Sequence, residues 1–379
     1  MNVAIIGGSL GGLAAGIVLR DLGHEIRIYE KSAGLMDDRG AGIVMQPETM
    51  TLLERMRKGG ACKVSVSCKT RRYLRRDGGT KAEMPMAQRF TSWGALYHTL
   101  RGAFPSDHYI QGHNLRELLP GKLNVRGRFQ SGAEFAADLV VGADGVDSAV
   151  RAHFLPHVRP AYAGYVAWRG TLPEAQTPPA VAEEFQNRFT FYQFPNSHAL
   201  CYLIPGANGE TARGERRFNW VWYVNYDATR ELPEVLTDRD GRQRRYSLPP
   251  GAVRDQWVQR LREEARRLLP PQFVALVEHT GQPFVQAVLD LSVTKMAFGR
   301  VCLLGDAAFV PRPHTAASTS KAIGNALDLA RAFANHPGDI EEALTGWEVP
   351  QISLGRHLVQ QGQFLGNRSQ FPQSQISIL

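Results

Sequence analysis

The sequence predicts an α/β fold in which a domain of buried parallel strands is interleaved with an α+β domain built on an antiparallel sheet, with helices at the C-terminal end. Short apolar, β-branched runs recur at the start of the chain, near residue 140 and near residue 302, as buried parallel strands require. Aromatic-rich runs separated by turn signals fill the middle of the chain. At 379 residues the chain exceeds what one hydrophobic core usually supports, so we expect two domains.

The first predicted unit lies at the N-terminus. "NVAIIG" is suited to a buried strand, and "LGGLAAGIVLRDLG" has small and apolar residues at helical spacing before Gly23 ends it. "HEIRIYEK" then alternates as a second strand that ends at Glu30. Between them lies "IIGGSLGGL", where Gly7 and Gly12 occupy the outer positions of a GxGxxG pattern and Ser9 the middle one. This order of elements is typical of a Rossmann-like nucleotide site, whereas the turn alone fits a glycine-rich loop without a ligand.

Each position of this unit has a physical role. Gly7 permits the tight turn after the strand, and Gly12 lets the helix pack closely on the sheet. Glu30 follows Gly12 by 18 positions and can accept hydrogen bonds from ribose hydroxyls. A pyrophosphate would lie at the helix N-terminus, where unpaired N–H groups favour negative charge. Ser9 is the smallest residue that can offer this phosphate a hydroxyl in place of the usual glycine.

A second motif lies in "ADLVVGADGVDSAVR". "DLVVGA" predicts another buried strand, and Asp144, Gly145, Ser148 and Arg151 follow it at DGxxSxxR spacing. A strand followed by a helix with Asp147 or Ser148 as its N-cap would explain single residues of this motif, although not the whole spacing.

A third motif lies in "GRVCLLGDAAFVPRPHTAASTSKAIGNALDLARAF". The strand "RVCLLG" places Asp306 at its carboxyl end, a turn passes through Pro311 and Pro313, and a helix begins near Ala316. A carboxylate at a strand end suits a ribityl or ribose hydroxyl, and a helix N-terminus favours a developing negative charge.

In this order and at this separation, the three motifs resemble the flavoprotein aromatic hydroxylases, the single-component FAD monooxygenases typified by para-hydroxybenzoate hydroxylase. The resemblance covers nearly the whole chain. The segments "GAGIVMQPE", "RFTSW", "YAGYVAWRG" and "GDAAFVPRPHTAA" are most similar to the members that hydroxylate dihydroxypyridines. The resemblance implies a Rossmann-like FAD-binding domain and a substrate domain.

The resemblance also implies which residues bind the cofactors, FAD and NADH or NADPH. Asp144 and Gly145 match a motif that contacts FAD and NAD(P)H, Asp306 matches the carboxylate that holds the ribityl chain, and Pro313 matches the proline at the reactive edge of the flavin. The full set of implied cofactor-binding residues is Gly7, Ser9, Leu10, Gly12, Glu30, Lys31, Asp144, Gly145, Asp306, Ala316 and Ala317.

Four positions depart from the family pattern. Phe309 stands where the family usually has His, and Ala316, Ser318 and Ser320 stand in place of a GxGxN pattern. Because those glycines let the helix start approach the flavin, their replacement by residues with a β-carbon predicts weaker retention of FAD.

The middle of the chain predicts the substrate layer. "AGYVAWRG", "RFTFYQF", "ALCYLIP" and "RFNWVWYVNY" are expected to form antiparallel strands, with turns at "PNS" and "PGANGE". Tyr192, Gln193 and Tyr202 are candidates to line a substrate site, and Arg188 to pair with an anionic substrate. His314 could take a proton from a hydroxyl group, and together with Pro313 it forms the predicted catalytic set. The alternatives are aromatic core residues, a surface arginine and a loop histidine.

The C-terminal region predicts helices that break at Pro337 and near Pro350. The tail from residue 367 to 379 lacks periodicity, and we expect it to become ordered through a partner subunit in a homodimer. We expect the domains to divide the chain as follows: FAD-binding at 1–75, 111–160 and 291–379, and substrate domain at 76–110 and 161–290.

Composition limits the remaining classes of function. The net charge of +8 comes from dispersed basic residues, and the one local cluster, at 238–246, fits a solvated loop, so we expect no nucleic-acid partner. Cys62, Cys68, Cys201 and Cys302 offer neither a disulfide framework nor zinc spacing, so we expect no metal and a cytoplasmic setting. Neither a signal peptide nor a membrane-spanning run is evident.

The resemblance implies that the protein uses NAD(P)H and O₂ to hydroxylate an electron-rich, hydroxylated aromatic or N-heteroaromatic ring, hydroxypyridine-like, through a flavin C4a-hydroperoxide. Two alternatives remain. One is another FAD-dependent monooxygenase, such as an epoxidase or a urate- or salicylate-type hydroxylase. The other is a weakly flavin-binding protein without turnover.

Overall fold

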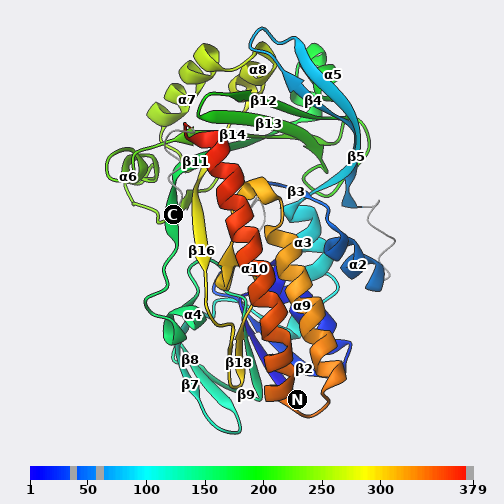
Figure 1. Ribbon diagram of the computed structural model, residues 1–379, viewed down its shortest axis with the longest axis vertical. Coiled ribbons are helices and arrows are strands. Elements are labelled where there is room, and N and C mark those ends of the chain that lie inside the picture. The colour runs from blue at the N-terminus through cyan, green and yellow to red at the C-terminus, as the bar shows by residue number, and fades with distance from the viewer. Residues whose placement is uncertain (35–40, 57–63, 373–379) are drawn as a thin grey trace.

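The computed structural model describes residues 1–34, 41–56 and 64–372; Cys62 lies outside these ranges. Its strands form sheets of six, ten and three strands. The six- and three-stranded sheets lie toward one end of an elongated molecule and the ten-stranded sheet toward the other (Figure 1). The predicted α/β class, with two domains that share the chain, is confirmed.

The six-stranded sheet contains the strands that carry the three sequence motifs. Its order is β17-β18-β10-β1-β2-β6, and every neighbouring pair is parallel except β17 with β18. The strands are β1 (Asn2–Ile6), β2 (Glu25–Tyr29), β6 (Tyr109–Ile110), β10 (Leu139–Gly142), β17 (Ala297–Phe298) and β18 (Val301–Leu303). The predicted strands β1, β2, β10 and β18 therefore lie side by side, and their carboxyl ends meet at one edge.

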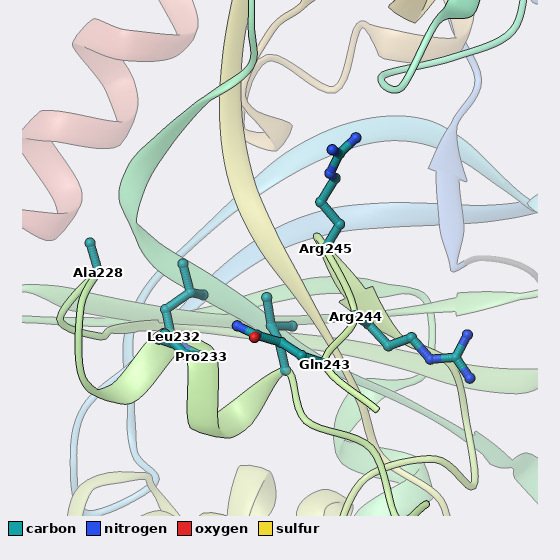
Figure 2. A pocket seen from close by; sticks show the side chains of 7 residues that line it. Ala228, Leu232, Pro233, Gln243, Arg244 and Arg245 are labelled. Atoms are coloured by element: carbon teal, nitrogen blue, oxygen red, sulfur yellow. The ribbon is translucent and has the colours of Figure 1, made fainter. Parts of the chain in front are cut away.

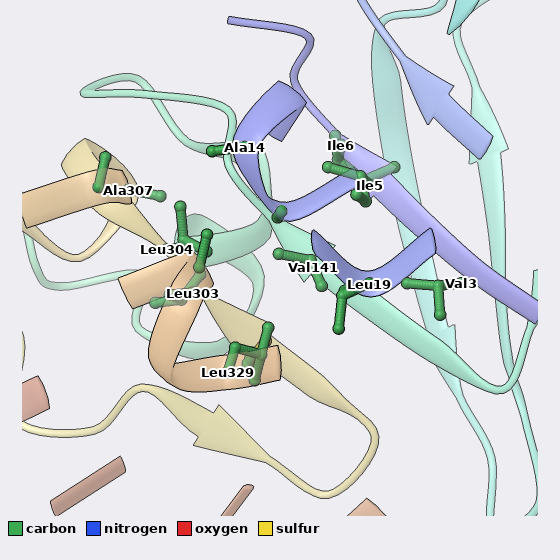
Figure 3. Packing of buried hydrophobic residues seen from close by; sticks show 14 of the residues in the cluster. Val3, Ile5, Ile6, Ala14, Leu19, Val141, Leu303, Leu304, Ala307 and Leu329 are labelled. Carbon is green, nitrogen blue, oxygen red and sulfur yellow. The ribbon is translucent and has the colours of Figure 1, made fainter. Parts of the chain in front are cut away.

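Two different layers cover this sheet. Successive side chains of a strand point to opposite faces of the sheet. On β2, Ile28 lies against Gly16 of α1 (Leu10–Arg20), whereas the next residue, Tyr29, stacks on Phe135. One face is therefore covered by α1, which packs against α9 (Ser318–Asn335). The other is covered by the three-stranded sheet of β7 (Leu115–Pro120), β8 (Val125–Phe129) and β9 (Glu134–Ala137). Figure 3 shows the apolar side chains of this core, among them Val3, Ile5, Val141, Leu303 and Leu329.

The ten-stranded sheet contains the aromatic-rich strands. Its order is β15-β16-β11-β14-β13-β12-β4-β5-β3, with β19 paired to β16. The strands are β3 (Gly42–Val44), β4 (Val66–Leu74), β5 (Thr80–Ser92), β11 (Ala161–Pro173), β12 (Arg188–Phe194), β13 (Ser197–Ile204), β14 (Arg217–Asn225), β15 (Ser247–Leu248), β16 (Phe284–Ser292) and β19 (Phe309–Val310). The four predicted strands β11 to β14 pair antiparallel, as expected.

Two features of this sheet could not be predicted from local sequence patterns. β12 pairs in parallel with β4, which comes from far earlier in the chain, so no hairpin dictates their direction. Because β4 begins at Val66, the chain also enters the ten-stranded sheet before residue 76. Long-range pairing of this kind leaves no signature in a local window of sequence.

The two faces of the ten-stranded sheet have different surroundings. Trp168, Trp220 and Trp222 point to the face covered by α7 (Asp255–Leu268) and α8 (Pro271–His279). The alternate residues point to the opposite face, which we call the inner face: Tyr165, Ala167, Arg169, Phe189, Phe191, His198, Leu200, Tyr202, Asn219, Val221 and Tyr223. Gly42 of β3, Ala316 and His314 lie against this inner face.

The other helices are α2 (Pro47–Arg55), α3 (Trp93–Arg101), α4 (Ala149–Phe154), α5 (Pro179–Phe185), α6 (Glu231–Val235) and α10 (Ile340–Gln370). Within the described ranges, no helix is long and apolar enough to cross a membrane.

α10 corrects one expectation. The helical break predicted at Pro337 is present between α9 and α10, but α10 continues through Pro350 and extends to Gln370 (Figure 1). Buried Leu344, Trp347 and Val359 lie on both sides of Pro350 and anchor the helix on the core, so packing outweighs the lost hydrogen bond. Residues 367–370, predicted to be non-periodic, are thus helical, and 373–379 lie outside the described residues.

Candidate cofactor and substrate site

The glycine-rich turn after β1 is crowded by backbone. Gly7 has a φ of +105°, and a β-carbon there would lie 2.3 Å from the carbonyl oxygen of Ala143. A β-carbon on Gly12 would lie 1.9 Å from the carbonyl oxygen of Gly7. The outer glycines therefore have the roles that the sequence predicts for them, a tight turn and a close approach of α1 to the strand.

The N-terminus of α1 suits a phosphate. Ser9 is the N-cap residue, but its side chain makes no capping hydrogen bond, so it leaves the N–H groups of the first turn to another acceptor. Leu10 is buried in the core behind this turn, and Lys31 is exposed beside it.

Glu30 lies at the carboxyl end of β2, beside the same turn. It is only 4% exposed, and its carboxylate accepts hydrogen bonds from the backbone N–H groups of Gly8 and Ser32, both at 2.8 Å. The Tyr109 hydroxyl closes the turn from the other side by donating to the Gly8 carbonyl oxygen at 2.9 Å. The ADP part of a dinucleotide fits this arrangement, with its phosphate at α1 and its ribose near Glu30.

The second motif connects the end of β10 with the start of α4 and with the third motif. Asp144 Oδ2 accepts hydrogen bonds from the N–H groups of Ala149 and Val150, at 2.7 and 3.2 Å, while Oδ1 is buried without a partner. Burial raises the pKa of Asp144 above its usual value, against the hydrogen bonds that lower it. Ser148 caps α4, as the structural alternative predicted, and Gly145 has a φ of +76°. Arg151 donates to the Ala307 carbonyl oxygen at 2.9 Å, which ties this motif to the third one.

The third motif contains an ion pair that sequence reasoning missed. Asp306 Oδ1 accepts hydrogen bonds from Ser318 Oγ at 2.8 Å and from Lys321 Nζ at 2.9 Å. The Lys321 side chain is 1% exposed and also donates to the carbonyl oxygen of Phe309. A lysine in the first turn of an otherwise small-residue helix was the available signal, since a buried ammonium needs a carboxylate nearby.

The segment before α9 is strained. Pro313 to Thr315 form a 3₁₀ turn, and Ala316 follows with φ +53° and ψ +21°, the left-handed region that favours glycine. Ala317 then precedes α9 with a φ of −106°. A β-carbon on Gly11 would lie 3.2 Å from the β-carbon of Ala322, so the first turns of α1 and α9 face each other at the same sheet edge. All three motifs therefore meet at the carboxyl edge of the six-stranded sheet.

His314 is buried among aromatic rings of the inner face. Its ring stacks on Tyr223 with centroids 4.7 Å apart, and His198 lies 5.1 Å away. Nδ1 lies 3.4 Å from the Tyr165 hydroxyl, and Nε2 lies 3.3 Å from Ser369 Oγ on α10. Burial, followed by the charges of His198 and Arg312, holds the pKa of His314 well below its usual value. His314 is therefore neutral near pH 7 and can accept a proton or a hydrogen bond.

The predicted substrate residues lie in different places. Tyr202 is buried on the inner face and Gln193 lies in register with His198. Tyr192 points to the opposite face, into the cluster under α8. Arg188 ion-pairs with Glu83 at 3.2 Å and donates to the Glu184 carbonyl oxygen at 3.1 Å.

Two inner-face residues that were not predicted carry unused donors. Asn219 is fully buried; its Oδ1 accepts from the N–H of Gly42 at 3.0 Å, whereas its Nδ2 has no partner. The Nε of Arg169 is also buried without a partner. The signal for both was the alternation of β11 and β14, which places them on the same face as Tyr202.

Two surface cavities lie away from these residues. One, of about 410 Å³, is lined by Ala228, Leu232, Pro233, Leu236, Gln243, Arg244 and Arg245 (Figure 2). Its arginines are already paired, Arg244 with Asp238 and Arg245 with Asp147, both at 2.7 Å. The other, of about 620 Å³, borders α10 between Val349 and Gln360. Within residues 1–34, 41–56 and 64–372, no group of side chains could hold a metal ion.

Comparisons with known proteins identify relatives of this chain. Residues 162–290 match the family model described as FAD binding domain-like. The chain is 34% identical over 373 residues to 2,6-dihydroxypyridine 3-monooxygenase of Paenarthrobacter nicotinovorans, covering 97% of this chain and 91% of that one. It is 27% identical to 6-hydroxynicotinate 3-monooxygenase of Bordetella bronchiseptica, covering 88% and 82%. The solved structure of 2,6-dihydroxypyridine-3-hydroxylase from Arthrobacter nicotinovorans matches with a TM-score of 0.92 at 32% identity, covering 97% and 92%.

Proposed function

Because the chain belongs to the FAD-dependent aromatic-ring monooxygenases, we propose that it hydroxylates a hydroxypyridine-like ring with NAD(P)H and O₂. The observation that carries this proposal is the 34% identity to a dihydroxypyridine monooxygenase over nearly the full length of both chains. The convergence of the three motifs at one edge of the parallel sheet supports it.

The residues around this edge fit FAD. We propose that Gly7, Ser9, Gly12 and Glu30 hold the ADP part, and that Asp306 and the start of α9 hold the ribityl and flavin parts. When bound, FAD would accept electrons from NAD(P)H and activate O₂. The protein has to bind the ring, orient it and exclude water.

The inner face offers groups for these tasks. Leu200 and Val221 provide an apolar floor, and Tyr202 and Asn219 provide polar groups that can orient a flat ring. We propose that neutral His314 accepts a hydrogen bond from the ring hydroxyl in exchange for one of its contacts with Tyr165 and Ser369, which draws electron density onto the ring. A more electron-rich ring is the better substrate for hydroxylation.

A panel of rings tests this function. FAD-loaded protein is mixed with NADH or NADPH and with 2,6-dihydroxypyridine, 6-hydroxynicotinate, salicylate or urate. We expect a hydroxypyridine to stimulate NAD(P)H oxidation and to yield a product that has gained one oxygen atom by mass. Background oxidation with every ring, or oxygen transfer only to an alkene, would refute the proposal.

One alternative retains specific support. The left-handed Ala316 and the Asp306 carboxylate engaged by Lys321 both favour a weakly flavin-binding protein without turnover. The panel separates the two, because such a protein shows no ring-stimulated oxidation of NAD(P)H even when saturated with FAD.

We propose a cytoplasmic setting and a homodimer. The free cysteines Cys68, Cys201 and Cys302, all buried, support a reducing compartment. Exposed Val349 and Phe364 on α10, 69% and 64% accessible, support an apolar contact between subunits. Light scattering of the FAD-loaded protein measures the mass, and a monomer would contradict the dimer.

A further inference from the structure

The inner face contains Arg169, a partly buried arginine. Arg169 lies on β11 opposite Val221 of β14, and its charge lowers the pKa of the Tyr202 and Tyr223 phenols against the effect of burial. Within residues 1–34, 41–56 and 64–372, no carboxylate forms an ion pair with Arg169. A partly buried guanidinium that lacks an anion is costly to keep, because its desolvation is not compensated.

Three buried arginines around this sheet have acidic partners. Arg216 pairs with Glu174, Arg312 with Asp290 and Arg72 with Glu184, each at 2.7 Å. Arg188, the arginine that the sequence suggested for an anionic substrate, is likewise engaged, with Glu83. Arg169 therefore stands apart from these four in having no carboxylate among the described residues.

The charged side chains of the inner face also favour an anionic ligand. Its residues on β11 to β14 are aromatic, apolar, amide, histidine and arginine side chains, and no aspartate or glutamate occurs among those defined above. At the far side, Arg71 lies over the rings of Phe189 and Phe191, 5.4 and 5.1 Å from their centroids. A ring that enters this face thus meets positive charge without a competing carboxylate.

Neutral donors accompany Arg169. Asn219 Nδ2 is fully buried without a partner, and Tyr202 stands beside Asn219 in the β13–β14 register. Ala316, at the start of α9, packs against the cluster that contains Tyr202, so these donors lie next to the predicted flavin side. An oxyanion on the ring would satisfy both Arg169 and Asn219 at once.

We propose that Arg169, with Asn219 Nδ2 and the Tyr202 hydroxyl, binds an oxyanion of the aromatic substrate, either a ring carboxylate or a deprotonated ring hydroxyl. The inference rests on the proposed function and deepens it, because it states that the substrate binds as an anion. It also moves the role predicted for Arg188 on β12 to Arg169 on β11 of the same sheet.

Binding to the oxidised, FAD-loaded protein tests the inference without turnover. The change in flavin absorbance is titrated with two matched pairs of probes: 6-hydroxynicotinate against 6-hydroxynicotinamide, and 2,6-dihydroxypyridine against 2,6-dimethoxypyridine. The first pair isolates a carboxylate and the second an ionisable hydroxyl. We expect the wild type to bind the anionic member of at least one pair about tenfold or more tightly, as a charge-assisted hydrogen bond provides.

Three variants locate the source of this preference. Arg169→Gln should abolish it, and Arg169→Lys should retain part of it. Asn219→Asp keeps the acceptor for the Gly42 N–H but places a carboxylate beside Arg169, so it should also abolish the preference even if Arg169→Gln folds poorly. Arg188→Gln is the matched control and should bind like the wild type.

The outcomes separate the inference from the proposed function. A wild type without preference in both pairs, or a preference that persists in Arg169→Gln and Asn219→Asp, overturns the inference whether or not rings stimulate NAD(P)H oxidation. A preference that depends on Arg169, in a protein that no ring stimulates, supports the inference and overturns only the proposed hydroxylation.

Discussion

At the scale of single residues, the site combines strain with buried titratable groups. Ala316 holds a left-handed backbone at the start of α9, where a residue without a β-carbon would be relaxed. His198 and His314 are buried against each other and against Tyr223, in surroundings that disfavour a second positive charge beside Arg312. Each feature has a measurable consequence.

Replacing Ala316 by Gly should stabilise the protein. Relief of the left-handed strain outweighs the greater freedom of glycine in the unfolded chain, for a net gain of about 0.5–1 kcal/mol in the free energy of unfolding. Urea denaturation of the FAD-free protein measures it. Ala317→Gly is the control, because Ala317 has a negative φ of −106° and should gain nothing. Equal or lower stability of Ala316→Gly would show that the site imposes no strain.

His198 should make stability depend on pH. Burial lowers the pKa of His198 to about 4, below its ordinary value of 6.5. Between these values the unfolded chain binds a proton that the folded chain excludes, so stability is full above pH 6.5 and falls toward pH 4, by on the order of 3 kcal/mol. In urea denaturation across this range, His198→Gln should show a smaller slope than the wild type.

The matched control for this slope is His157→Gln, because His157 is exposed. It should keep the slope of the wild type. An unchanged slope in His198→Gln would assign the pH dependence to other groups, with His314 the first to examine, since its pKa is lowered in the same direction.

At the scale of elements, packing decides what local propensity leaves open. α10 contains Pro350 in its interior and still runs unbroken from Ile340 to Gln370, since it is anchored on the core on both sides of the proline. Its last turn carries Ser369 and Gln370, which contact His314 and His198, and the Asn225 amide donates to the Gln370 carbonyl oxygen at 2.7 Å. A helix that ended near Pro350 would leave the two histidines without these partners.

Pro350→Ala should therefore raise stability. Proline in a helix interior costs about 3 kcal/mol relative to alanine, and Pro350 is exposed, so the change should gain about 1–3 kcal/mol without disturbing the core. Thermal and urea denaturation measure the gain. Arg356→Ala, at another exposed position of the same helix, should change the free energy of unfolding by less than about 0.5 kcal/mol. A loss of stability in Pro350→Ala would mean that the proline supports a bend on which packing depends.

At the scale of the whole molecule, the proposed cofactor site joins distant parts of the chain. Gly7 and Glu30 lie near the N-terminus and Asp306 and Ala316 near the C-terminus, yet their strands are neighbours in one sheet or pack beside it. The inner face of the ten-stranded sheet packs against Ala316 from the other domain. A ligand that spans these segments stabilises the folded chain by mass action.

Removal of FAD should lower the melting temperature, and FAD should restore it. At a free FAD concentration about 100 times its dissociation constant, the gain is about 2.7 kcal/mol. FMN lacks the adenylate that Gly7 to Gly12 and Glu30 are placed to bind, so FMN at the same concentration should stabilise far less. Thermal unfolding of the apoprotein with each flavin measures the difference. Equal stabilisation by FMN and FAD would contradict an ADP site at α1.

Much of the FAD region could be predicted because its chemistry is local. The crowding at Gly7 and Gly12, the strand ending at Glu30 and the cap at Ser148 each depend on a few consecutive residues. The substrate side could not be predicted in the same way. Tyr192 and Tyr202 look alike in the sequence but point to opposite faces. Arg188 has a carboxylate partner from β5, whereas Arg169 has none among the residues that the structure describes.

The sequence by itself therefore determined the order of the motifs and the strands that carry them, because hydrophobic period and glycine sterics act over short spans of chain. The class of cofactor followed from the resemblance of these motifs to the FAD monooxygenases. Only the tertiary structure decided that Arg169 has no acidic partner among the described residues, that His198 and His314 are buried and that α10 passes Pro350 unbroken. These depend on long-range contacts, since burial and ion pairing are properties of residues that meet only after the two sheets and α10 have packed together.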